Sequence, residues 1–402
     1  MFIAPMGYFP VLIPLHLALV SAILAIATYT LSVLSERRPL SIWGTEIKLI
    51  MWLVAFAIIS IPFSRWRGGS YELLFDVYLK SVIVFFLIAN IMTSERRLRG
   101  FLWALTIYCA INSLVGINDY RTGALYQGRI KGAGYSGLTA NPNDLALSLN
   151  LIIPFMWYLI VTTHKRLPKM IAVGSLALSI MCIVITYSRG GAITLFSILL
   201  FFILTRSGKS LFPSLLGAVF VIAVIMSLAP EGYSDRLAST TDFSKDDGSA
   251  SARWQLMIIG LRQSIEHPFG VGLGMNDLIQ FDQGLGWSEV HNVYLQISSE
   301  LGIIPAVLFV ILIWKLIVSM RKIKDADTKE LGTYLVLARA TQASLVAFAV
   351  AGMFHPVAYN FYFYIIAGIA VALNALSARF TSGNQIGTYH STKKSWDLSF
   401  SG

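Results

Sequence analysis

The sequence predicts an all-α, polytopic membrane protein with about 11–12 transmembrane helices and a large helical segment outside the membrane. Of the 402 residues, 56% are hydrophobic and 13% are charged, whereas about a quarter of the residues of a soluble domain are charged. The apolar residues form continuous runs, and a membrane β-barrel would need alternating strands of about ten residues. One long polar segment, residues 230–295, interrupts the apolar sequence late in the chain.

Eleven apolar runs are candidate spans, with ends defined to within a few residues. In chain order they are 11–34, 49–63, 73–93, 101–118, 140–163, 169–187, 191–205, 211–229, 296–319, 334–354 and 358–378. The runs 49–63 and 191–205 are shorter than the roughly 20 residues that a crossing needs, so either they use flanking residues or one is not a true crossing. In the run 73–93, Asp76 and Lys80 lie four residues apart and can pair on one helix face.

Clusters of basic residues predict the orientation of the spans. The sequences Arg96-Arg97-Leu-Arg99 and Arg321-Lys322-Ile-Lys324 are typical of cytoplasmic ends of spans. This rule places the N-terminus and residues 230–295 outside the cytoplasm and the C-terminus inside. It also accounts for the net charge of +10, so we expect a lipid bilayer and no nucleic acid as a partner.

The chain is predicted to have four parts. They are an N-terminal transmembrane bundle 1–229, an outer segment 230–295, C-terminal transmembrane helices 296–380 and a mobile cytoplasmic tail 381–402. The run 11–34 lacks a basic start and a small-residue cleavage site, so it is predicted to be a retained span and not a signal peptide.

The sequence indicates no metal or cofactor site. Cys109 and Cys182 lie inside apolar runs and have no metal-binding spacing. There is no phosphate-binding loop, no dinucleotide fingerprint and no Asp-x-Asp pair outside the membrane. We therefore expect metal-independent chemistry with no cofactor.

The outer segment is predicted to contain a loop at 239–251 and an amphipathic helix at 253–266. His267-Pro268 should end this helix, and a glycine-rich bend follows at 270–274. Residues 290–296 should begin the ninth span, which would place His291 near a helix N-terminus.

His291 is the best candidate for a catalytic base, because imidazole accepts protons near neutral pH. Glu289 and Asn292 can orient it, and a helix N-terminus would keep it neutral. The alternative is a histidine that only makes hydrogen bonds at the membrane interface. His355 is the second choice.

Arginines outside the membrane are candidates for holding an anion. Arg189 precedes Gly190 and Gly191, whose backbone could approach a phosphate closely, and Arg253 begins the amphipathic helix. The alternatives are a snorkelling Arg189 and a solvated Arg253. Further positive charge comes from Arg65, Arg67 and Arg129. Together these residues describe a basic vestibule that suits an anionic substrate with a lipid tail.

Asn141 and Asn143 open the fifth span together with Pro142. Capping of the helix explains these residues, and contact of their amides with a sugar is an alternative role.

Several short motifs, in this order, resemble those of the O-antigen ligase and O-antigen polymerase superfamily of bacterial envelope enzymes. The motifs are Leu138-Thr-Ala-Asn141-Pro142-Asn143, Tyr187-Ser188-Arg189-Gly190-Gly191, Arg253-Trp254, Pro268-Phe-Gly270-Val-Gly272-Leu-Gly274, His291-Asn292-Val-Tyr294-Leu-Gln296 and Glu300-Leu-Gly302. The likeness is close over roughly residues 135–310 and extends elsewhere only to the layout of spans.

The resemblance implies a GT-C-like, inverting glycosyltransferase in the bacterial inner membrane, with its active site facing the periplasm. The donor would be an undecaprenyl-diphosphate-linked glycan, held by Arg189 and Arg253. His291 would activate the acceptor hydroxyl, with Tyr294 among the supporting residues. The acceptor stays open: lipid A core would define a ligase, a growing glycan a polymerase, and protein an oligosaccharyltransferase. A transporter of lipid-linked glycans and an inactive scaffold are the alternatives from other classes.

Overall fold

The computed structural model describes residues 17–36, 44–126, 129–130, 141–205, 249–282, 284, 288–323 and 329–378. These residues confirm the all-α polytopic fold class. Apart from helices, turns and loops, the described residues form one small hairpin that pairs β1 (Leu125–Tyr126) with β2 (Arg129–Ile130).

Eight helices of the described residues are long and apolar enough to cross a membrane. They are α2 with η3 (Thr45–Ser60 and Ile61–Phe63), α3 with η4 and α4 (Arg67–Leu73, Leu74–Tyr78 and Leu79–Ile91), α5 (Glu95–Thr122), α6 (Pro142–Thr162), α7 (Arg166–Ile185), α14 (Ile303–Arg321), α15 (Lys329–Ala351) and a last helix, Phe361–Ala378. Two shorter apolar helices are α1 (Leu17–Glu36) and α8 (Arg189–Leu204).

Ten of the eleven predicted runs therefore coincide with helices. The run 211–229 and the tail 381–402 lie outside the described residues, as does the predicted loop 239–251 up to residue 248. The prediction is wrong for residues 249–251, which form the first turn of a helix (Ser249–Glu266). The predicted pair inside the third run is confirmed, because Lys80 Nζ lies 2.8 Å from Asp76 Oδ1.

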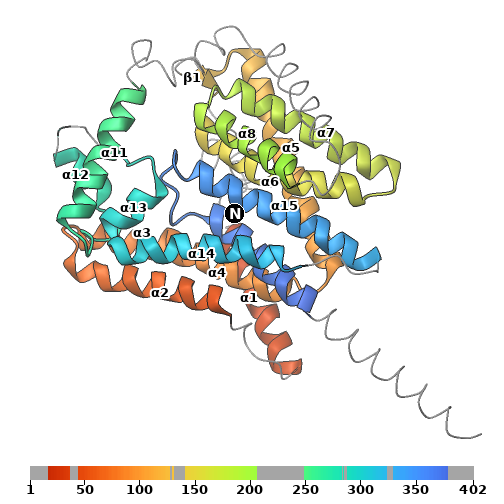
Figure 1. Cartoon of the computed structure of the whole chain (residues 1–402), viewed down its shortest axis with the longest axis horizontal. Helices are drawn as coiled ribbons and strands as arrows, with labels where there is room; N and C mark the ends of the chain where they lie inside the picture. Colours follow the sequence, from red (N-terminus) through yellow and green to blue (C-terminus); the bar gives the residue numbers. More distant parts are fainter. Residues whose placement is uncertain are drawn as a thin grey trace, which may run out of the picture.

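The helices form two groups joined by α15 (Figure 1). One group contains α5, α6, α7 and α8, and the other contains α2, α3, α4 and α14. α15 packs against α6 and α8 on one side and against α14 on the other. Its Phe348 meets Phe363 of the last helix with ring centroids 5.1 Å apart, and Phe309 of α14 lies 4.9 Å from the same ring.

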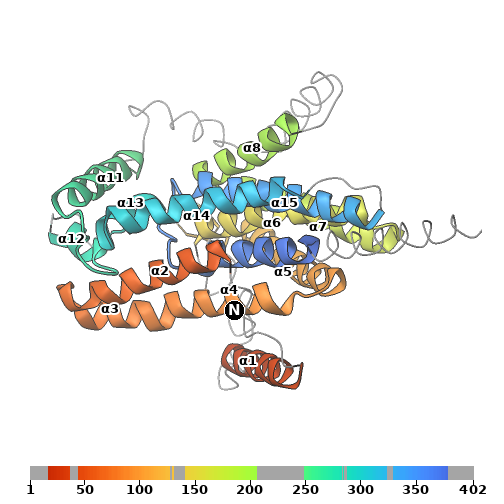
Figure 2. The same ribbon diagram turned by 60° about the horizontal axis from the view of Figure 1, so that its bottom comes forward.

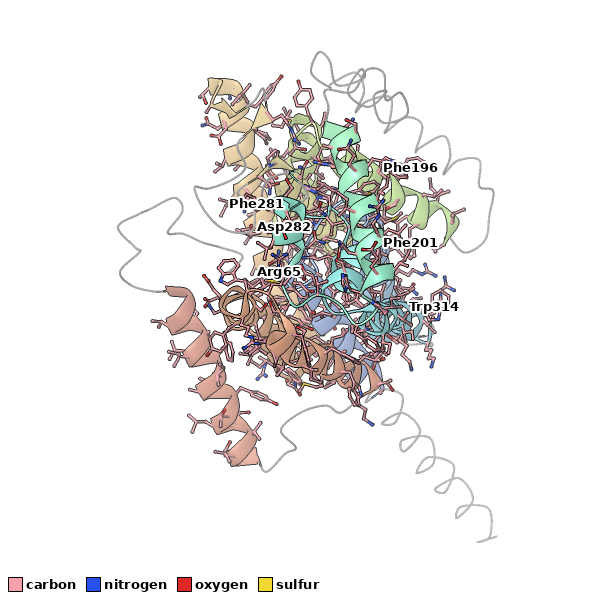
Figure 3. All side chains as sticks on the ribbon, turned by 90° about the vertical axis from the view of Figure 1, so that its left-hand side faces the viewer. Arg65, Phe196, Phe201, Phe281, Asp282 and Trp314 are labelled. Carbon is pink, nitrogen blue, oxygen red and sulfur yellow. The ribbon has the colours of Figure 1, made fainter. Side chains whose placement is uncertain are left out.

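The outward faces of the helices carry large apolar side chains, as expected for lipid contact. Phe196 of α8 and Trp314 of α14 point away from the bundle (Figure 3), and Trp314 is 63% exposed.

Three short helices gather at one end of the bundle: α11 (Ser249–Glu266), α12 (Asn276–Asp282) and α13 (Val293–Glu300). Figures 1 and 2 show them at the left, above the left-hand ends of α2 and α3. α11 ends at Glu266, so the stop predicted at His267-Pro268 is confirmed.

The predicted ninth span, 296–319, is wrong at its start. The chain forms α13 up to Glu300 and a separate helix, α14, from Ile303. Gly302 between them has a φ of 107°, a conformation that side-chain-bearing residues avoid. The predicted run hides this break, because the apolar residues of α13 lead directly into the apolar helix α14 and hydropathy alone does not register a change of direction.

The apolar stripe of α11 is not the face that packs on the protein. Trp254, Ile258 and Leu261 are exposed, whereas the opposite face carries Gly260 and Ser264. These small residues allow α11 to approach α13 closely, and Ser264 Oγ lies 2.7 Å from Ser298 Oγ. The amphipathic pattern thus predicts the helix correctly but does not indicate which face packs.

The loop between α11 and α12 is fixed by backbone hydrogen bonds to the α13–α14 junction. Val271 N donates to Ser299 O (3.0 Å), Gly272 N donates to Glu300 O (2.9 Å), and Ile303 N donates to Pro268 O (3.0 Å). The loop is held from the other side by Ser70 Oγ of α3, which donates to Leu273 O. These bonds attach the outer segment to the membrane helices.

We expect Gly270→Ala to destabilise the protein strongly. Gly270 has a φ of 81°, and a Cβ there would collide with the Glu300 carbonyl. Gly123→Ala is the matched control, because Gly123 has a φ of 71° but open space around it. This control should lose only the cost of a left-handed backbone conformation, about 1–2 kcal/mol. Thermal unfolding of both variants in detergent checks this prediction. Equal losses of stability would show that the loop does not pack as described.

Candidate functional site

The predicted site residues belong to segments that meet at the outer-segment end of the bundle. A Cβ on Gly190 would lie 3.1 Å from Phe354 Cβ and 3.6 Å from His355 Cε1. His355 Nε2 lies 3.3 Å from Asn143 O at the start of α6. Val293 N, at the start of α13, donates to Gly352 O (2.7 Å). The first turns of α6, α8 and α13 are therefore neighbours of the turn after α15.

The imidazole of His291 is oriented by its own backbone. Its Nδ1 atom lies 2.7 Å from Glu289 O. A carbonyl oxygen only accepts hydrogen bonds, so in the neutral ring Nδ1 carries the proton and Nε2 carries the lone pair. The sequence analysis named Glu289 as a residue that can orient His291, and the orienting group is its backbone carbonyl.

His291 has a lowered pKa of about 4, chiefly because it is buried. The positive charge of Arg253 and the neighbouring His355 lower the pKa further, and the hydrogen bond to Glu289 O opposes them. The direction agrees with the sequence prediction, although burial and Arg253, not a helix dipole, are the causes. Arg253 acts on His291 through its charge, so α11 brings this guanidinium within electrostatic range of the imidazole.

Arg189 begins α8 at the same end of the bundle, directly before Gly190. The glycine pair packs closely on protein: a Cβ on Gly191 would lie 2.8 Å from Ala146 Cβ. The expectation that both glycine amides are available to a phosphate is wrong, however. Gly191 N donates to Ser188 Oγ (3.2 Å), which caps α8.

His355 is enclosed by the protein. It is 2% exposed, and its Nδ1 and Nε2 atoms face Ala351 O (2.9 Å) and Asn143 O (3.3 Å). Burial lowers its pKa, the two carbonyls oppose this, and Arg253 lowers it further. His355 thus connects the end of α15 to the start of α6, and its ring nitrogens are not directed at a substrate.

The Glu289 side chain is open to solvent on one side, yet the surrounding protein desolvates it. Desolvation raises its pKa to about 7, and the negative charges of Asp277 and Asp144 raise it further. The Glu289 carboxyl is therefore partly protonated near neutral pH.

Several of the predicted supporting residues hold the first turns of the helices. Asn141 Oδ1 caps α6, and Asn292 Oδ1 caps α13 by accepting from Tyr294 N (2.9 Å) and Leu295 N (3.1 Å). Tyr294 Oη donates to Ala349 O (2.8 Å). Arg129 joins two helices, because its Nε donates to Thr186 O and its Nη2 to Asn143 Oδ1, both at 2.9 Å.

Arg65 and Arg67 lie on the surface at the start of α3. Arg65 forms an exposed ion pair with Asp282 of α12, and the two side chains lie together in Figure 3. The described part of the chain shows no hydrogen bond or ion pair for Arg67. Neither residue is brought to His291 by a contact of the described residues.

The sequence analysis quoted Glu300 as part of a motif but gave it no role. Its carboxyl is buried, and it accepts hydrogen bonds from Tyr359 Oη (2.7 Å) and Asn276 N (3.3 Å). Burial raises its pKa to about 8 in spite of these bonds. The signal in the sequence was an acidic residue inside an apparently apolar run.

The described residues contain no group of three or more His, Cys, Asp or Glu side chains that could hold a metal ion.

We expect Arg253→Gln to raise the pKa of His291 by roughly one unit, because removal of a positive neighbour stabilises the imidazolium form. NMR titration of isotope-labelled histidine in the purified protein measures this pKa, and His291→Gln assigns the resonance. Arg262→Gln is the matched control on the same helix, since Arg262 is exposed. If the pKa of His291 is unchanged in Arg253→Gln, the Arg253 guanidinium does not influence the charge of the imidazole.

Comparison with known proteins was made for the sequence and for the fold. A chain from a solved structure of a peptidoglycan synthase complex is similar over 84% of this chain and 98% of its own, with 15% identity and a TM-score of 0.48. No curated protein matches the chain. Residues 174–310 match the family model described as O-antigen ligase. This range includes Arg189, Arg253 and His291, and it supports an O-antigen ligase- or polymerase-type, glycosyltransferase-like function in the membrane. The match confirms the chain's resemblance to the O-antigen ligase and O-antigen polymerase superfamily.

Proposed function

We propose that the protein transfers a glycan from undecaprenyl diphosphate to an acceptor hydroxyl at the periplasmic face of the bacterial inner membrane, as an O-antigen ligase does. One observation carries this proposal. At the outer-segment end of a membrane-spanning bundle, His291 is kept neutral beside Arg253, with its Nδ1 proton committed to Glu289 O.

The proposed reaction is a direct displacement. His291 Nε2 accepts the proton of the acceptor hydroxyl while the hydroxyl oxygen attacks the anomeric carbon of the donor sugar. The bond from that carbon to the diphosphate oxygen breaks, and the diphosphate leaves with the electron pair. Attack opposite the leaving group inverts the anomeric configuration.

Arg189 and Arg253 are proposed to hold the diphosphate. Guanidinium groups form paired hydrogen bonds with phosphate oxygens. They would stabilise the negative charge that grows on the leaving group, which is a large contribution to catalysis in a site shielded from water. The proposal thus assigns to two arginines the role that a metal ion has in other transferases.

The low pKa of His291 fits this order of events. In the empty site Arg253 disfavours the imidazolium form. A bound diphosphate would offset the charge of Arg253 and so raise the pKa of His291. The base would therefore become stronger when the donor is present.

We expect His291→Ala to lower the transfer rate by about 10²–10⁴-fold, the usual contribution of a general base, with donor binding retained. Arg189→Ala and Arg253→Ala should weaken donor binding as well as transfer. The assay uses purified protein in nanodiscs with a lipid-linked glycan, and donor affinity is measured separately.

Arg262→Ala, on the same helix as Arg253, is the control and should keep nearly full activity. Full transfer activity in all three site variants, with correct membrane insertion, would contradict the proposed site, whereas no transfer by the unchanged protein would contradict the enzyme function and favour a transporter or a scaffold.

A further inference from the structure

A polar cavity lies next to the candidate site. Its volume is about 440 Å³, within the range of small-molecule sites. Its walls come from the start of α3 and η4, the loop before α12, α13 and the turn before the last helix. These segments are far apart in the sequence, so only the folded outer segment creates this cavity.

The lining of this cavity is acidic. It includes Glu72, Asp76, Asp277, Glu289 and Glu300, and no Lys or Arg is among its lining residues. Asp76 is paired with Lys80 (2.8 Å), and the remaining carboxylates would repel a diphosphate by their like charge. The donor must therefore bind elsewhere, on the side of Arg253 and Arg189.

Glu289 connects the cavity to His291. Its carboxyl lines the cavity and is influenced by the charge of Asp277 across it. Its backbone carbonyl accepts the hydrogen bond from His291 Nδ1. A molecule in the cavity therefore lies next to the residue that orients the proposed base.

The remaining lining groups suit a sugar. Gln296 is 9% exposed and its Oε1 accepts from Ala358 N (3.1 Å), while its Nε2 has no hydrogen-bond partner among the described residues. Asn360 adds a second amide, and the Trp66 indole, 52% exposed, adds an aromatic face. Carboxyl and amide groups bind hydroxyls, and an aromatic ring packs against the apolar face of a sugar.

We propose that this cavity is the acceptor site and that it takes an uncharged or amine-bearing saccharide while disfavouring saccharides that carry carboxylate or phosphate groups. This inference rests on the proposed function and extends it to the second substrate. It assigns the two substrates to opposite sides of Glu289 according to their charge.

Transfer kinetics test the assignment with phenyl β-glucoside, phenyl β-glucosaminide and phenyl β-glucuronide as acceptor probes. Trp66→Ala and Asn360→Ala should each raise the acceptor KM about five- to tenfold, the loss of one contact of about 1 kcal/mol. The donor KM and kcat should change less than twofold. A rise in the donor KM with an unchanged acceptor KM would overturn the proposal.

Glu72→Lys should shift the preference toward the glucuronide, because it adds a positive charge to the cavity. Glu266→Lys is the matched control, since Glu266 is an exposed carboxylate of the outer segment that does not line the cavity. An identical preference in both variants would overturn the proposal.

Binding of the same probes by saturation-transfer NMR, without donor, separates this inference from the proposed function. If the protein binds the glucoside and Trp66→Ala weakens this binding, the cavity is a saccharide site even if no transfer occurs. Glucoside binding that Trp66→Ala and Asn360→Ala leave unchanged would overturn the inference, whatever the transfer activity.

Discussion

The candidate site depends on the break between α13 and α14. Gly302, with a φ of 107°, ends one apolar helix and lets the next begin in another direction. The break is stabilised by the buried Glu300 carboxyl, which accepts hydrogen bonds from Tyr359 and from the Asn276 backbone. Because α13 is freed from the long span, its first turn faces the turn after α15, and His291 directly before it reaches the end of the bundle. A continuous helix from 293 to 321 could not place His291 in this way without moving the loop that carries α12.

The second constraint is the separation of charge in a region of low dielectric. Arg253 lies near His291, whereas Asp277, Glu289 and Glu300 line the adjoining cavity. Like charges gathered in such a place repel one another, and the raised pKa values of Glu289 and Glu300 show this cost together with desolvation. The arrangement is understandable if the two sides meet different molecules, one anionic and one not.

Local sequence signals predicted the elements better than their contacts. Hydropathy located the membrane helices because burial in lipid requires a continuous apolar run. The cap at Asn141 and the stop at His267 followed from backbone chemistry within one turn, whereas the cap that Asn292 supplies to α13 was not predicted. The buried face of α11 did not follow, because Gly260 packs on α13 through its small size, which no hydrophobic pattern records. Glu300 was likewise overlooked as a site residue, since its partners come from 24 and 59 residues away in the chain.

Burial of His291 lowers its pKa and so weakens it as a base, and binding of an anionic donor would offset this effect. Burial and the charge of Arg253 keep His291 neutral, so its lone pair is available throughout the physiological pH range, but a pKa of about 4 makes it a weak proton acceptor. An anionic donor beside Arg253 removes part of the electrostatic penalty on the imidazolium form. The affinity of His291 for a proton is then coupled to occupancy of the donor site, and the same coupling requires that protonation of His291 strengthen donor binding. In the proposed reaction, proton transfer is thereby favoured once the donor is bound, and without a donor His291 would not abstract protons from water or from the acceptor alone.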